Sequence, residues 1–200
     1  MKRIGICCAL LALALVACDR SRASSGAPSS SDEVAAAIGP SIYPLGLSFR
    51  DQDDRTISLD VFRGHRVIVS SFYASCPSAC PLTISRIQSV ERELGSVDRA
   101  DLRVLLVSFD PEHDTPPVLR ATAESHHLDA SWDLTSATES DARTLGAALS
   151  IPFTKLPNGG FSHGSSIIVL DEGGRPVARA DGPSADLAPL VTSLKAHGAS

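Results

Sequence analysis

Two cysteines four positions apart, between an expected strand and an expected helix, constrain the fold more than any other feature of this chain. Residues 66–73 are rich in Val, Ile and Phe, which is typical of a buried strand. Cys76 and Cys80 follow it, and Pro81 stands where a helix can begin, since the N–H that it lacks has no partner in a first turn. Thiols at such a turn can face one another. They can form a disulfide or, as thiolates, share one soft metal ion.

The apolar pattern predicts strands that alternate with helices. The expected strands are 45–49, 56–59, 66–73, 102–109, 132–134, 166–170 and 176–180, and the expected helices are 82–94, 117–127, 138–149 and 184–197. Strands alternating with helices imply βαβ units. Because a Cys pair lies between a strand and a helix, and a hairpin and a helix end the chain, we predict an α/β, thioredoxin-like fold. Its central mixed sheet would be flanked by helices and preceded by an N-terminal β-hairpin.

Particular residues are expected to mark helix ends. Gly95 should end the helix that follows the cysteines. Thr138 and Asp141 have the spacing of a capping box, so the third helix should begin there. Ser184 is the expected cap of the last helix, and the lone Trp132 is an expected core residue.

The first residues have the features of an export signal. Lys2 and Arg3 precede an apolar stretch at 4–16, which has about the length of a signal h-region and is too short to span a bilayer comfortably. The sequence 15–18, Leu-Val-Ala-Cys, is similar to the processing box of bacterial lipoproteins, in which cleavage precedes the Cys and a lipid is attached to its sulfur. We therefore expect lipidation at Cys18. An ordinary signal peptide or a short anchor is the alternative.

The chain is accordingly expected to have three parts: a signal at 1–17, a flexible tether rich in Ser, Ala and Gly at 18–40, and one domain at 41–200. Loss of Lys2 and Arg3 with the signal takes the formal net charge from −5 to −7. An acidic domain without a Lys/Arg cluster argues against nucleic-acid binding. We expect a monomer held by its lipid on the outer, periplasmic face of a bacterial cell membrane.

The five cysteines reduce to one functional pair. Cys7 and Cys8 would leave with the signal, and Cys18 would carry the lipid. Cys76 and Cys80 then remain as the only thiols of the mature protein. In an oxidising compartment such a pair tends to form a disulfide unless it is reduced or bound to metal.

His163 is the candidate for a third ligand. Thioredoxin-like reductases have a Pro before the penultimate core strand that packs over the Cys pair, whereas this chain has Ser165 and Ser166 there. His163 stands at the edge of this segment, so the fold should direct it toward the thiols. Two sulfurs and one imidazole suit copper better than zinc, because a structural zinc site needs four ligands. A hydrogen-bonded loop His is the alternative.

Four segments together resemble the Sco/SenC family of membrane-tethered copper proteins, over roughly residues 45–194. They are Asp60-Val61-Phe62-Arg63-Gly64, Cys76-Pro77-Ser78-Ala79-Cys80-Pro81, Val107-Ser108-Phe109-Asp110-Pro111-Glu112-His113-Asp114-Thr115-Pro116, and His163 shortly before Ile167-Ile168-Val169-Leu170-Asp171-Glu172-Gly173. The resemblance implies that Cys76, Cys80 and His163 bind copper, as Cu(I), Cu(II) or both. It also implies delivery of copper to the binuclear copper centre of cytochrome c oxidase, or to another periplasmic copper protein.

Two other functions stay open at this point. A thiol–disulfide oxidoreductase would use Cys76 and Cys80 to reduce the cysteines of an acceptor, although the Cys-x3-Cys spacing differs from the usual Cys-x2-Cys. A copper or redox sensor is the third possibility. Asp110 ends a central strand at the edge where α/β sheets place their sites, so it should either tune the pair electrostatically or hold a backbone turn. Whether His113 contributes is left open.

Overall fold

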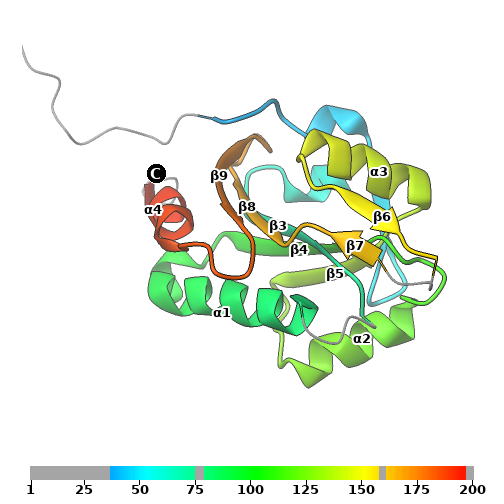
Figure 1. The fold of residues 1–200 in the computed structure, drawn as a ribbon. Helices are drawn as coiled ribbons and strands as arrows, with labels where there is room; N and C mark the ends of the chain where they lie inside the picture. Colours follow the sequence, from blue (N-terminus) through cyan, green and yellow to red (C-terminus); the bar gives the residue numbers. More distant parts are fainter. Residues whose placement is uncertain (1–36, 75–78, 158–160, 197–200) are drawn as a thin grey trace, which may run out of the picture. The chain divides into compact units, whose positions relative to one another are not determined.

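The computed structural model describes residues 37–74, 79–157 and 161–196 of the chain (Figure 1). All of them belong to the compact unit Glu33–Ser200, the second of two units in the chain. None of the helices in the described ranges combines the length and the apolar character needed to span a bilayer.

A seven-stranded mixed sheet forms the centre of the described structure. Its spatial order is β2-β1-β5-β4-β3-β8-β9. Strands β3, β4 and β5 are mutually parallel, whereas β1, β2, β8 and β9 pair antiparallel to their neighbours. The strands are β1 (Ser48–Asp51), β2 (Thr56–Ser58), β3 (Arg66–Phe72), β4 (Leu102–Ser108), β5 (Trp132–Ser136), β8 (Ser166–Leu170) and β9 (Pro176–Asp181).

Helices cover both faces of this sheet. The helices α1 (Ala79–Asp98), α2 (Pro116–Ser125) and α4 (Ala188–Ala196) lie on one face, and α3 (Glu139–Ala148) lies on the other (Figure 1). Side chains of the first three join one core cluster, and those of α3 join the other, together with the 3-10 helices Tyr43–Leu45 and Leu59–Phe62. Successive side chains of β4 alternate between the two clusters: Val104 and Leu106 enter the first, Leu105 and Val107 the second. The central strands are therefore buried on both faces, which is why they are continuous apolar runs in the sequence.

The α/β, thioredoxin-like prediction is confirmed, with its N-terminal β-hairpin at β1–β2. Thr138 caps α3, since its side chain accepts a hydrogen bond from the Asp141 N–H at 3.1 Å. Trp132 is 2% exposed in the core. Gly95 does break α1, with φ 74°, a conformation that glycine adopts without steric cost, but the helix resumes and ends at Asp98.

Two predicted helix starts were wrong. α4 begins at Ala188 rather than at Ser184, and the Asp186 carboxylate accepts the Ala188 N–H at 3.0 Å. α1 begins at Ala79, so Pro81 lies inside the first turn, where a proline is still tolerated.

One hairpin was not predicted at all. Strands β6 (Phe153–Lys155) and β7 (Phe161–His163) pair antiparallel in a small sheet of their own, between α3 and β8. Each strand has only three residues, too few for a period of two to be visible in the sequence.

Candidate functional site

The carboxyl-terminal ends of β3 and β4 define the edge at which the candidate site lies. The two strands end side by side, because Phe72 pairs with Ser108. β8 runs antiparallel to β3, with Ser70 opposite Ile167, so the residues that precede β8 lie beyond the end of β3. The chain therefore brings three connections to one edge: the exit from β3, the exit from β4 and the entry to β8.

The three predicted metal ligands belong to these connections. Cys80 is the second residue of α1, and His163 ends β7, where its backbone pairs with Phe153. Cys76 lies outside the described residues, and so do the side-chain positions of Cys80 and His163. The predicted ligand set and the predicted direction of the His163 ring therefore remain predictions.

The donor set itself fits a soft metal ion. Thiolates and imidazole prefer copper, zinc or iron to calcium or magnesium. The first turn of α1 also suits a thiolate, since the N-terminus of a helix lowers the pKa of a cysteine. Cys80 occupies that turn.

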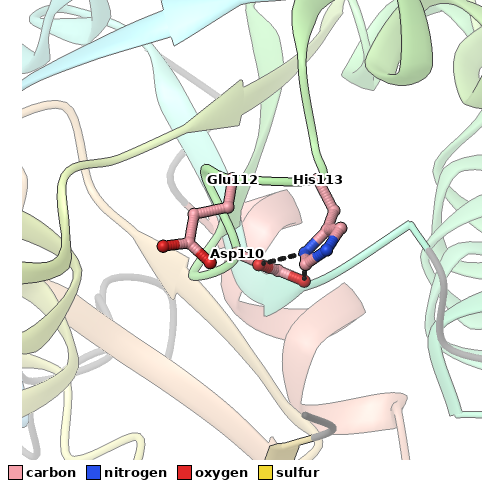
Figure 2. A group of neighbouring side chains, drawn as sticks. All are labelled: Asp110, Glu112 and His113. Carbon is pink, nitrogen blue, oxygen red and sulfur yellow. Dashed lines mark hydrogen bonds and ion pairs between the residues drawn. The ribbon is translucent and has the colours of Figure 1, made fainter.

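Asp110 follows the end of β4 and is 4% exposed. Figure 2 shows its carboxylate facing the ring of His113, whose Nδ1 lies 2.9 Å and 3.0 Å from the two carboxylate oxygens. The hydrogen bond to Asp110 raises the pKa of His113. The backbone carbonyl of Asp110 also accepts the N–H groups of His113, at 3.2 Å, and Asp114, at 2.8 Å. Asp110 thus has a side-chain partner and holds a backbone turn.

Within the described ranges, Asp110, Glu112 and His113 each have one ligand atom within 4.8 Å of those of the other two (Figure 2). These are one imidazole and two carboxylates, a harder set than the cysteines offer. The imidazole nitrogen nearest the carboxylate of Asp110 is already paired with it. The arrangement is explained by the ion pair between Asp110 and His113.

Asp114 has a structural role that the sequence reasoning did not assign. It is 1% exposed, and its Oδ2 accepts the backbone N–H of Ala74 at 2.9 Å and the hydroxyl of Ser108. Burial raises the pKa of this carboxyl group. The only signal in the sequence was its place in the Asp-Pro-Glu-His-Asp-Thr-Pro segment, which gave no hint that it reaches back to the end of β3.

Four aromatic rings hold β6 and β7 against this edge. Phe161 lies 5.4 Å from Tyr73 and 4.8 Å from Phe109, centroid to centroid. Phe109 also packs on Tyr73 at 5.5 Å and stacks on Phe153 at 4.9 Å. Tyr73 follows β3 and Phe109 follows β4, so the rings connect the small hairpin to both central strands.

A cavity of about 140 Å³ lies where this ring cluster meets the turn after β4. Lys155 and Glu112 form an ion pair of 3.4 Å at the same place. The lining residues are Phe109, Asp110, Pro111, Glu112, Glu139, Arg143, Phe153, Lys155 and Phe161.

Comparison with known proteins decides the family. The sequence pattern of SCO1/SenC matches residues 45–197, which include every described element from β1 to α4. The chain belongs to the SCO1/SenC family. Among curated relatives, a "Putative copper-binding protein" of Stutzerimonas stutzeri is 32% identical over 107 residues, 54% of this chain and 52% of that protein. The chain spans about half the length of the curated relatives that it matches first.

Solved structures of the Sco family share this fold. BsSco matches with a TM-score of 0.70 and 19% identity. Its structure is described as identifying a disulfide switch in a member of the Sco family of cytochrome c oxidase assembly proteins. The match covers 83% of this chain and 98% of BsSco. ScoI of Bradyrhizobium japonicum, solved with copper bound, has a TM-score of 0.64 and 21% identity, over 76% of this chain and 97% of ScoI. At these identities the structures establish the fold of this Sco-family chain.

Proposed function

We propose that this protein is a membrane-tethered copper metallochaperone that binds copper through Cys76, Cys80 and His163. The observation that carries the proposal is the convergence of chain connections at one sheet edge. The exit from β3 and the entry to β8 lie there, α1 begins shortly after β3 at Ala79, and Phe161 of β7 packs on Tyr73 and Phe109 at this edge. The names of a copper-binding relative and of a copper-bound Sco structure support the choice of metal.

The proposed mechanism is ligand exchange. Reduced Cys76 and Cys80, with His163, would hold copper in a partly exposed site, and thiolates of an acceptor would replace them one at a time. The proposed acceptor is the copper-bearing subunit of cytochrome c oxidase or another periplasmic copper protein. The description of BsSco as a cytochrome c oxidase assembly protein supports this choice.

Copper titration under anaerobic conditions tests the proposal. The reduced mature protein should bind one Cu(I) tightly, and Cys76→Ser should lose most of that affinity, because the proposed site needs both thiolates. Oxidation of the pair to a disulfide should abolish tight binding in the same way. Cu(I) binding that survives both changes would assign the ligands to other residues.

A thiol–disulfide oxidoreductase is the second candidate function. Cys80 lies in the first turn of α1, a position that activates a thiol, and the disulfide switch named for BsSco favours redox chemistry in this family. Such an enzyme would reduce the disulfide of an acceptor, with transfer of two electrons, in the absence of metal. Turnover of a disulfide substrate by metal-free protein, together with weak Cu(I) binding, would favour this candidate over the chaperone.

The proposed location is the outer, periplasmic face of a bacterial cell membrane. The sequence Leu15-Val16-Ala17-Cys18 supports lipid attachment at Cys18, and acyl chains bind a membrane with about 0.8 kcal/mol per buried methylene. Asp19 follows, a residue that retains lipoproteins in the inner membrane of enteric bacteria. Cys18→Ala should release or misprocess the protein. An intact mass that shows an unmodified Cys18 on the mature chain would contradict the proposal.

A further inference from the structure

The carboxylate of Asp114 joins segments that are far apart in the sequence. Its Oδ2 accepts the N–H of Ala74, at 2.9 Å and 40 positions away, and the hydroxyl of Ser108. Ala74 follows the end of β3, and Ser108 is the last residue of β4. One buried oxygen atom therefore fixes the exit from β3 relative to the end of β4.

The hydrogen bonds around Asp114 also fix its own position. The Ser108 hydroxyl, while donating to Asp114, accepts the N–H of Asp110 at 3.0 Å. The carbonyl of Asp110 in turn accepts the N–H of Asp114 at 2.8 Å. Backbone and side chain of Asp114 are thus held by the same turn, which makes the carboxylate a rigid acceptor for Ala74.

Only one of the two oxygen atoms of this buried carboxylate is hydrogen-bonded to the part of the chain that the structure describes. Asp114 is 1% exposed, and its Oδ1 is buried without a hydrogen-bond partner among the described residues. A buried polar atom without a partner costs free energy. Oδ2 therefore holds Ala74 and Ser108, whereas Oδ1 adds no hydrogen bond from the described ranges to the stability of the fold.

We propose that Asp114 is a positioning residue for the two thiols. Cys76 lies two residues after Ala74, and Cys80 lies one residue after Ala79, the first residue of α1. Asp114 fixes the chain at Ala74, before the segment that carries Cys76, and α1 fixes it after that segment, from Ala79 onward. By holding the Ala74 N–H, Asp114 sets the separation and mutual orientation of the sulfurs. This inference rests on the proposed function, because it concerns the same pair of thiols.

The equilibrium of the pair with glutathione measures this positioning without metal. In that reaction the two thiols and one oxidised glutathione give the protein disulfide and two reduced glutathione molecules. Its equilibrium constant reports the effective concentration of one thiol at the other. Alkylation followed by peptide mass analysis reads the state of Cys76 and Cys80 separately from the other cysteines of the full chain.

Asp114→Ala should lower this equilibrium constant by about 10-fold, because it releases one end of the segment that carries the thiols. Asp114→Asn should restore it to within about 3-fold of wild type, since the amide oxygen can still accept from Ala74 and Ser108. An Asn variant as impaired as the Ala variant, with an intact fold, would overturn positioning through hydrogen bonds.

Asp51→Ala is the matched control. Asp51 is 0% exposed, and its carboxylate likewise accepts backbone N–H groups in a turn, those of Asp53 at 2.9 Å and Arg55 at 2.8 Å. Those partners belong to the β1–β2 hairpin. Asp51→Ala should lower the unfolding temperature as Asp114→Ala does, yet leave the thiol equilibrium within about 2-fold of wild type. Equal effects of the two variants on the thiols would overturn the proposal.

Two further measurements keep the test decisive. Ser108→Ala removes the hydroxyl that orients Asp114 and should shift the thiol equilibrium in the same direction by at least about 3-fold, even if Asp114→Ala does not fold. A thiol equilibrium that is unchanged in both Ser108→Ala and Asp114→Ala would refute the role of Asp114. Failure of wild-type protein to bind Cu(I) would instead refute the proposed chaperone function, and the glutathione equilibrium would still test the positioning.

Discussion

Replacement of Phe161 by Ala should loosen the β6–β7 hairpin without unfolding the domain. A hairpin of two strands is marginally stable by itself in water, so its attachment to the central sheet decides whether it stays closed. Phe161 provides two ring contacts, with Tyr73 at 5.4 Å and Phe109 at 4.8 Å. At about 1 kcal/mol for each aromatic pair, their loss should favour opening by about 2 kcal/mol, or roughly 30-fold.

Native-state hydrogen exchange measures this opening. The amide of Gly164 donates to the carbonyl of Pro152 at 3.1 Å and closes the base of the hairpin, so it reports the local event. The amide of Val104 in β4 donates to the carbonyl of Ser131 at 2.9 Å and reports the central sheet. Phe161→Ala should accelerate exchange at Gly164 by roughly 30-fold, with a smaller change at Val104.

Phe161→Leu is the control for apolar contact without a ring. It should accelerate exchange at Gly164 less than Phe161→Ala does, because the leucine still covers Phe109. Unchanged exchange at Gly164 in Phe161→Ala, or equal acceleration at Gly164 and Val104, would refute the view that the rings hold the hairpin as a separate unit.

Three more outcomes follow from the site and the core. Bound Cu(I) should protect Cys76 and Cys80 from alkylation, as measured by peptide mass analysis, and equal labelling with and without copper would contradict ligation by this pair. His163→Ala should weaken Cu(I) binding by ~10-fold, about 1.4 kcal/mol, because two thiolates alone can hold Cu(I), and it should weaken Cu(II) binding more strongly. Paired titrations with the two ions check this. Unchanged affinity for both ions would remove His163 from the site. Burial raises the pKa of Glu91, so its stabilising contribution is present below the unfolded-state pKa and is lost as pH rises through the folded-state pKa. Glu91→Gln should therefore unfold at a higher denaturant concentration than wild type at pH 7 and lose this advantage in acid. A variant that is less stable than wild type at pH 7 and gains stability relative to it in acid would contradict the sign of the shift.

The central strands and the start of α3 could be predicted because local sequence and burial determine them. Val104, Leu105, Leu106 and Val107 form an apolar run of the length and β-branched content typical of a strand buried on both faces. Thr138 marks the start of α3, because its hydroxyl oxygen accepts the N–H of Asp141, three residues later. In both cases the deciding interaction either joins residues close together in the sequence or follows from burial of an apolar run.

The features that were missed depend on contacts between distant segments. Nothing local marks β6 and β7 as strands, since Phe153 and Phe161 gain their packing from Phe109, some fifty residues earlier in the chain. Asp114 reaches Ala74 across 40 positions, and a hydrogen bond of that kind leaves no periodic pattern. The start of α4 was misplaced because Ser184 and Asp186 are both residue types that cap helices, and in the structure Asp186 accepts the N–H of Ala188.

The pairing of β3 with β8 also sets an order of events as the chain emerges with its N-terminus first. The hydroxyl of Ser70 donates to the carbonyl of Ser166, 96 positions later, at 2.7 Å. The first five strands of the chain can assemble as soon as they have emerged on the side of the membrane where the protein folds, but β3 keeps one unpaired edge until β8 has emerged as well. Cys76 and Cys80 are made long before His163. Every emerging chain therefore passes through a stage in which its two thiols are present before the proposed third ligand, and any factor that protects them from premature oxidation must act within that interval.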